Sequence, residues 1–167
     1  MAVQLQHLAL IGFAGLMLAA AFEDLRRLMI PNVLPLALCL LWPLSLLSSP
    51  SLSGALGAIG CAVVVFIVGA LCFSRGLLGG GDVKLLTAAT LWAGPTQTLA
   101  LLVLTGVLGG VLALFLLAPH GAHLAILARA KLGPAEGPNG HRADTPVPYA
   151  IAIAAAAIIV VLLPSFR

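Results

Sequence analysis

The chain has 167 residues, of which 62% are hydrophobic and only 8% are charged. A soluble domain carries roughly 25% charged residues, because polar groups must cover its surface. The 5 acidic and 8 basic residues of this chain cannot cover such a surface, which excludes a water-soluble fold. The apolar content also excludes a disordered chain. The net charge of +3 is not gathered in a basic run, so nothing indicates a nucleic-acid partner.

Apolar stretches that could cross a lipid bilayer follow one another along the chain. A crossing helix needs about 20 apolar residues. The region from Val83 to Ala118 is too long for one crossing, and the helix-breaking pair Gly94-Pro95 predicts a turn between two helices inside it. We therefore predict an all-α, polytopic membrane helix bundle of about six transmembrane helices, forming one domain over residues 1–167. The other predicted helices cover Leu8 to Phe22, Val33 to Leu47, Leu56 to Phe73 and Val147 to Leu163.

Basic residues gather on one side of this arrangement. Membrane proteins keep Lys and Arg in cytoplasmic loops, so that side is predicted to be cytoplasmic. We expect a mobile cytoplasmic loop at residues 119–146, and we expect the first apolar helix to be retained, because no Lys or Arg precedes it as in a cleaved signal. The cytoplasmic side would carry Arg26, Arg27, Arg75, Lys84, Arg129, Lys131 and Arg142, against Arg167 on the other side.

Three acidic residues, Glu23, Asp24 and Asp82, lie where predicted helices meet the cytoplasmic interface. An ionisable group at a membrane bundle costs free energy, so each is a functional hypothesis. If the first helix continues through Arg27, that arginine can pair with either Glu23 or Asp24. A charge cluster that only fixes orientation is the alternative interpretation. Pro31 is expected in the first turn of the next helix, where its missing N–H does no harm.

Asp82 closes a glycine run, Gly79-Gly80-Gly81. Glycine allows close approach of backbones, and an aspartate after such a run is well suited to cap the next helix. A capped glycine loop is therefore the structural alternative to a functional site. Lys84 would lie in the first helical turn, where the helix dipole disfavours a cation, so we expect an acid or a lipid phosphate as its partner.

Asp24 and Asp82 are predicted at the same depth on the cytoplasmic side. Two carboxylates in a partly desolvated site cannot both ionise easily, so one keeps a proton and the other acts as a base. One group then takes a proton from water while the other donates to a carbonyl or a leaving nitrogen. Such a pair can hydrolyse a peptide bond without a covalent intermediate.

Four blocks of the sequence, in order, resemble the signatures of type IV prepilin peptidases. The likeness is strongest to the short, CpaA/TadV-like branch that serves tight-adherence (Flp) pili, and it extends from about residue 10 to residue 163. The blocks are Asp24-Leu25-Arg26, Ile30-Pro31-Asn32, Gly79-Gly80-Gly81-Asp82-Val83-Lys84 and Val147-Pro148-Tyr149-Ala150-Ile151-Ala152-Ile153.

The resemblance implies an aspartyl endopeptidase of the GxGD type in the bacterial inner membrane. Such enzymes remove the leader from prepilins at the cytoplasmic face, after a glycine that precedes the hydrophobic pilin helix. Asp24 and Asp82 match the two catalytic aspartates, no metal or other cofactor is implied, and the partners are a prepilin and the lipid bilayer. Site-shaping or substrate-orienting roles are implied for Gly79, Gly81, Lys84, Arg26, Pro31, Asn32, Pro148 and Tyr149.

Other functions stay open at this point. Larger family members also methylate the pilin and carry an extra N-terminal segment, often with paired cysteines; the seven residues before the first span and the lack of a CxxC pair predict no methyltransferase activity. A transporter or proton relay would also place acids in a membrane, although no repeated halves occur. A non-catalytic subunit of a pilus or secretion assembly is a third class. A metal site on His120, His123 and His141 is a weaker hypothesis.

Overall fold

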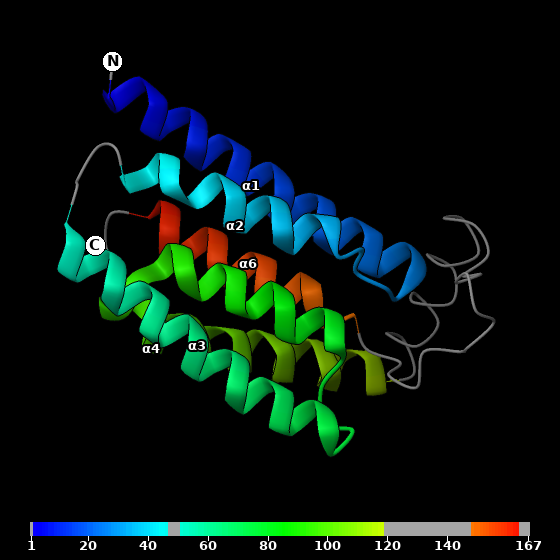
Figure 1. Ribbon diagram of the computed structural model, residues 1–167. Helices are drawn as coiled ribbons and strands as arrows, with labels where there is room; N and C mark the ends of the chain where they lie inside the picture. Colours follow the sequence, from blue (N-terminus) through cyan, green and yellow to red (C-terminus); the bar gives the residue numbers. More distant parts are fainter. Residues whose placement is uncertain (1, 47–50, 119–147, 164–167) are drawn as a thin grey trace.

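The computed structural model describes residues 2–46, 51–118 and 148–163, and within them the regular elements are all helices. The predicted all-α fold is thereby confirmed, while the predicted loop at residues 119–146 lies outside the described part of the chain. The helices are α1 (Ala2–Arg27), α2 (Val33–Leu46), α3 (Leu52–Ser74), α4 (Gly80–Leu117) and α6 (Tyr149–Leu162), arranged as a bundle (Figure 1).

The α4 helix consists of two helical halves joined by a sharp turn at Gly94. This glycine has φ 69° and ψ 179°, a conformation that only glycine adopts readily, and Pro95 follows it. A straight helix would carry Gly109 about 40 Å away from Asp82. Instead, Gly109 packs against Tyr149, at the start of α6, and α6 begins at the same end of the bundle as α4 (Figure 1). The chain therefore reverses at Gly94, as the Gly94-Pro95 pair predicts.

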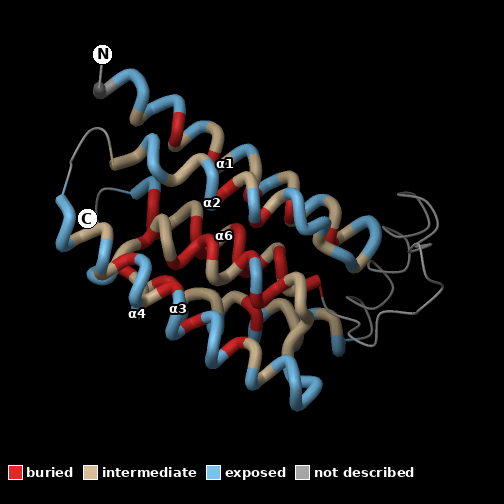
Figure 2. Tube along the Cα trace, in the orientation of Figure 1, coloured by how far each residue is buried: buried red, intermediate tan, exposed pale blue. Residues whose placement is uncertain are grey.

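Large apolar side chains cover the outside of the bundle. Exposed leucine, isoleucine, valine and phenylalanine residues recur along α3 and along the second half of α4, and the outer helices are pale blue over much of their length in Figure 2. Within the described ranges, three helices are long and apolar enough to cross a membrane, Gln4–Arg27, Leu52–Ser74 and Gly80–Leu117, while α2 and α6 are shorter apolar helices. Extended apolar surface of this kind indicates a membrane protein. The number of about six crossings stays a prediction.

The interior is built from small residues, above all on α6. This helix contacts both α1 and α4. Most of the α6 helix is buried, and many of its buried residues are alanines. Ala150, Ala154 and Ala157 are among them, and they pack with Phe13 and Met17 of α1 in one cluster. Small side chains let helix backbones approach closely, which is the usual way in which membrane helices associate. As a result, the first turn of α6 comes within hydrogen-bonding distance of α1.

One end of the bundle gathers several helix termini. The helices α1 and α3 end there and α4 and α6 begin there (Figure 1). The basic residues of the described chain, Arg26, Arg27, Arg75 and Lys84, belong to these termini. This is the side that the charge distribution predicts to be cytoplasmic, and it is also the end that carries both buried aspartates.

Candidate active site

Asp24 lies in the last turn of α1 and is only 6% exposed. The helix continues to Arg27, and its end is marked by Leu28, whose φ of 51° is left-handed. The Leu28 amide still donates to the Asp24 carbonyl at 2.8 Å, which keeps the last turn closed. The Asp24 side chain accepts a hydrogen bond at Oδ2 from the backbone amide of Ala150, at 3.0 Å. Asp24 is therefore held from the start of α6.

Its neighbour Glu23 pairs with Arg27. The Arg27 Nε atom lies 3.3 Å from Glu23 Oε2, with the i, i+4 spacing that a continuous helix predicts. Of the two acids within reach of Arg27, Glu23 is thus the one that this arginine pairs with, whereas Asp24 is buried and accepts from Ala150. Arg26 is exposed at the end of the same helix, on the surface beside the site.

Asp82 lies in the first turn of α4 and is 8% exposed. The helix begins at Gly80 with Gly79 as its N-cap, so the suggestion that Asp82 itself is the N-cap is wrong. Asp82 is the third helical residue, and its carboxylate reaches back to hydrogen-bond the Gly79 backbone, as the acidic residue of a capping box does. Its Oδ1 atom is buried and has no hydrogen-bond partner among the described residues.

The two aspartates form a pair. They come from the end of α1 and the start of α4, both are buried at the same end of the bundle, and their charges interact. Within a medium of low polarity, two neighbouring carboxylates hold one shared proton more readily than none. This is the arrangement that acid and base catalysis by two carboxyl groups requires.

Two of the motif glycines make room for this pair. A side chain at Gly79 would place a Cβ 2.7 Å from Asp82 Oδ2, so any larger residue would displace the carboxylate. A Cβ at Gly81 would lie 3.0 Å from the Cβ of Ile30, in the connection between α1 and α2. Gly81 thus lets that connection pack on the start of α4, which brings the two aspartate-bearing termini together.

Lys84 and Asn32 join the same two segments on the surface. The Lys84 ammonium donates to Asn32 Oδ1 at 2.8 Å, so the expectation of an acid or lipid phosphate is wrong: the cation finds an amide oxygen. Pro31 precedes α2 by two residues, so the expectation that it lies in the first turn of that helix is also wrong. The Pro31 carbonyl accepts from the Leu34 amide with i, i+3 spacing, and the first i, i+4 hydrogen bond runs from the Leu36 amide to the Asn32 carbonyl.

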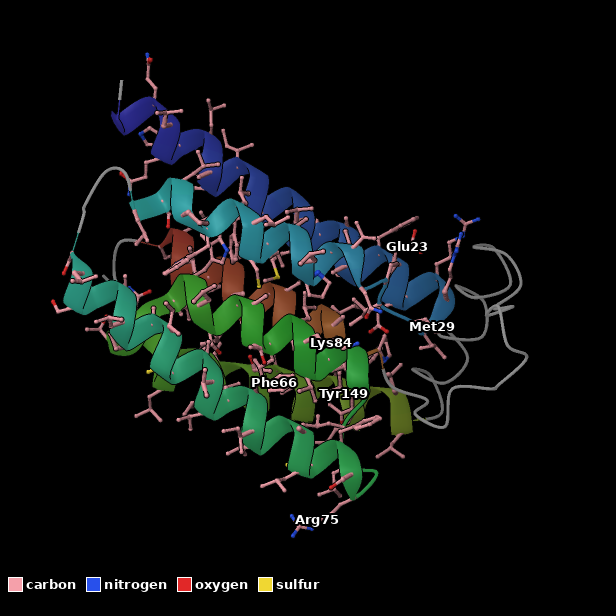
Figure 3. The ribbon with its side chains drawn as sticks, in the orientation of Figure 1. Glu23, Met29, Phe66, Arg75, Lys84 and Tyr149 are labelled. Carbon is pink, nitrogen blue, oxygen red and sulfur yellow. The ribbon has the colours of Figure 1, made fainter. Side chains whose placement is uncertain are left out.

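Pro148 and Tyr149 begin α6 beside the pair. Pro148 is the N-cap and provides no side-chain hydrogen bond. The Tyr149 ring packs over Gly109, where a Cβ would lie 3.3 Å from its Cε1 atom. In Figure 3, Tyr149, Lys84, Glu23 and Met29 lie toward one end of the bundle.

Sequence analysis missed the amide of Ala150, because every residue except proline has a backbone N–H and the residue type does not indicate which one bonds to a site residue. The one available signal was Pro148: a helix that starts at a proline has no capping side chain of its own, so its first amides need acceptors from elsewhere.

No group of three or more potential metal ligands occurs in the described ranges. His120, His123 and His141, the residues of the weaker metal hypothesis, lie outside those ranges.

Comparison with known families gives one match. A family model for the type IV leader peptidase family matches residues 11–114, which include Asp24, Gly79, Gly81 and Asp82. No curated protein and no solved structure matches the chain. The family match spans more than half of the sequence, and the chain belongs to the type IV leader peptidase family.

Proposed function

We propose that this protein is a membrane aspartyl endopeptidase that removes the leader peptide from type IV prepilins of the Flp type. Asp24 and Asp82 are the catalytic residues of the proposal. The observation that carries it is their burial as an interacting pair at one end of the bundle, although they come from different helices. The family match supports a leader peptidase activity.

In the proposed reaction, one aspartate is ionised and the other protonated. The ionised carboxylate takes a proton from a water molecule, whose oxygen attacks the carbonyl carbon of the scissile peptide bond. The protonated carboxyl group donates to the carbonyl oxygen, which gives a tetrahedral diol. The carboxyl group that took the water proton then donates it to the leaving nitrogen as the carbon–nitrogen bond breaks, and the other carboxylate takes a proton back from the diol. Asp82 Oδ1, which is buried without a partner in the described chain, supports this role because it is the acceptor left available for water or substrate.

Proposed cleavage occurs at the cytoplasmic face of the bacterial inner membrane. The described basic residues belong to helix termini at the end that carries the aspartates, and Lys and Arg favour the cytoplasmic side. Six crossings in a single peptidase domain, residues 1–167, complete this topology, with the turn at Gly94 on the opposite side. The Flp type of substrate follows from the resemblance to the short branch of the family.

The remaining motif residues have supporting roles in the proposal. Gly79 leaves room for the Asp82 carboxylate, and Gly81 leaves room for the connection that follows Asp24. Lys84, Asn32 and Pro31 fix that connection, Arg26 orients the substrate at the surface, and Pro148 with Tyr149 sets the start of α6.

The test is leader removal by variants that keep the shape of each side chain. Asp24→Asn and Asp82→Asn, each purified and mixed with a prepilin in liposomes, should lose at least about 100-fold in cleavage rate, because each carboxyl group has its own proton-transfer role. Glu23→Gln is the matched control, since Glu23 is the adjacent acid but is paired with Arg27. We expect it to cleave within about threefold of the unmodified protein, because the neutral amide keeps the shape of the side chain and Glu23 has no part in the proposed proton transfers.

Correct insertion of every variant is checked by its yield in the membrane and its thermal unfolding. Cleavage at the normal rate by either aspartate variant would exclude the two-carboxylate mechanism. It would favour the alternative in which the acids are structural parts of an assembly subunit.

A further inference from the structure

The start of α6 is completed by a residue from another helix. The first amides of any helix have no partner within the helix and need acceptors from outside. At the N-cap, Pro148 offers no side-chain acceptor, and its carbonyl accepts from Ile151 at 3.3 Å. The amide of Ala150 donates instead to Asp24 Oδ2 at 3.0 Å, across 126 residues of sequence. Asp24 therefore acts as the cap of α6 from the end of α1.

This contact matters more to Asp24 than to α6. Asp24 lies in the last turn of α1, where the carbonyl end of the helix dipole disfavours a carboxylate. The amino end of α6 carries the opposite partial charge and favours it. A hydrogen bond from a backbone amide also fixes the direction of the carboxylate, because the amide itself is fixed by the helix.

The position of that amide is set by packing on two sides. Ala150 is fully buried and belongs to the same core cluster as Met17 and Ala20 of α1. On the other side, the Tyr149 ring lies against Gly109 in the second half of α4, where no side chain is in the way. The first turn of α6 is thus held between the two helices, and its amide has little freedom to move relative to Asp24.

We propose that the backbone amide of Ala150, presented by the first turn of α6, is a positioning group that holds the Asp24 carboxylate in its reactive orientation. The inference rests on the proposed peptidase function and adds a part of the site that no motif side chain supplies. It also gives Pro148 and Tyr149 a specific role. They fix the residue at which α6 begins, so that the Ala150 amide lies within hydrogen-bonding distance of Asp24.

The experiment removes the N–H and keeps the helix. Ala150→Pro lacks the donor, and proline is tolerated in the first turn of a helix. One control accompanies it: Ala150→Gly keeps the amide. All are full-length proteins, tested for cleavage of a purified prepilin in liposomes.

A second variant replaces only the N–H group of residue 150, by an ester oxygen. Incorporation of lactic acid at position 150 by nonsense suppression replaces the amide by an ester, which keeps the methyl group and the shape of the chain. This variant avoids the added ring of proline in a fully buried position. It decides the outcome if Ala150→Pro does not fold.

For Ala150→Pro and for the ester, we expect kcat to fall by roughly 10- to 100-fold with KM within about twofold, because a misplaced catalytic group slows the reaction and leaves substrate binding intact. The Ala150→Gly control should stay within about threefold of the unmodified protein. An ester variant with normal kcat, or one in which only KM rises, would overturn the inference. Absence of cleavage by the unmodified protein would instead reject the proposed function, and this inference with it.

Discussion

The two aspartates of the site are held in different ways. Asp82 is fixed by its own surroundings: its carboxylate bonds to the backbone of Gly79, three residues earlier, in the first turn of α4. Asp24 is fixed from a distance, by the amide of Ala150 on another helix. One half of the pair is therefore a local structure, while the other depends on the assembly of the bundle.

This difference separates two kinds of change. A substitution next to Asp82 can displace the carboxylate and leave the packing of the helices intact, since the contacts involved lie within a single turn. A change that affects Asp24 must alter how α1, α6 and the connection after α1 meet. Substitutions that displace only the Asp82 carboxylate should consequently lower activity and leave stability unchanged. Substitutions that affect the position of Asp24 should change activity and stability together.

The largest loss of cleavage activity is expected for a substitution at Gly79, which affects only the locally fixed aspartate, Asp82. Gly79→Ala would place a Cβ 2.7 Å from Asp82 Oδ2. The backbone at this position has φ −72° and ψ 142°, which alanine adopts easily, so only the carboxylate is in the way. We expect prepilin cleavage to slow by about 100-fold with thermal unfolding almost unchanged, since a shift of about 1 Å in a catalytic group has such an effect.

Gly106→Ala is the matched control for this substitution. It also adds one methyl group to α4, but no atom lies within 4 Å of the added Cβ. This variant should cleave at the normal rate. A Gly79→Ala protein that is as active as Gly106→Ala would mean that the Asp82 carboxylate is not confined by the glycine loop.

Sequence analysis predicted some local features for a physical reason, although the expected N-cap role of Asp82 and the expected helical position of Pro31 were wrong. The turn at Gly94-Pro95 and the pairing of Arg27 with one of two nearby acids depend on backbone conformation or on spacing within one helix, and the structure shows that the acid is Glu23. The contact of Gly79 with the Asp82 carboxylate is of the same kind, since both residues lie within one turn. Such interactions are encoded by neighbouring residues and can be predicted without knowledge of the fold.

The contacts that join distant segments could not be predicted in this way. The partner of Lys84 was expected to be an anion and is the amide of Asn32, because the packing of the α1–α2 connection decides which group comes within reach. The contact of Gly81 with Ile30 and the donation from Ala150 to Asp24 depend equally on helix packing. Nothing in the identity of Ala150 distinguishes it from the other alanines of α6.

An intermediate effect is expected where α4 meets the α1–α2 connection. Gly81→Ala brings a Cβ to 3.0 Å from the Cβ of Ile30 and 3.3 Å from its outer side-chain carbons. We expect about tenfold slower cleavage together with a lower unfolding temperature, because the connection after Asp24 must move. Adding Ile30→Ala removes the outer carbons and should restore part of both losses, which a double-mutant cycle measures. Strictly additive effects would show that the two residues do not constrain each other.

The smallest effect is expected for the surface bond between Lys84 and Asn32. Both residues are exposed, so water replaces much of the bond when one partner is lost. Lys84→Met and Asn32→Leu should each slow cleavage by about two- to fivefold, and the double variant should be no slower than either one. Asn32→Asp keeps an oxygen acceptor for the cation and should remain close to normal.

Arg75→Met is the control for the loss of a positive charge near the same end of the bundle, since Arg75 is an exposed cation that follows α3. If the bond positions the connection after Asp24, the two partners must give equal effects, because either substitution removes the same contact. A loss confined to Lys84→Met, with Asn32→Leu normal, would instead mean that the ammonium acts on the prepilin directly. The connection between α1 and α2 would then be positioned by packing, which includes the contact of Ile30 with Gly81.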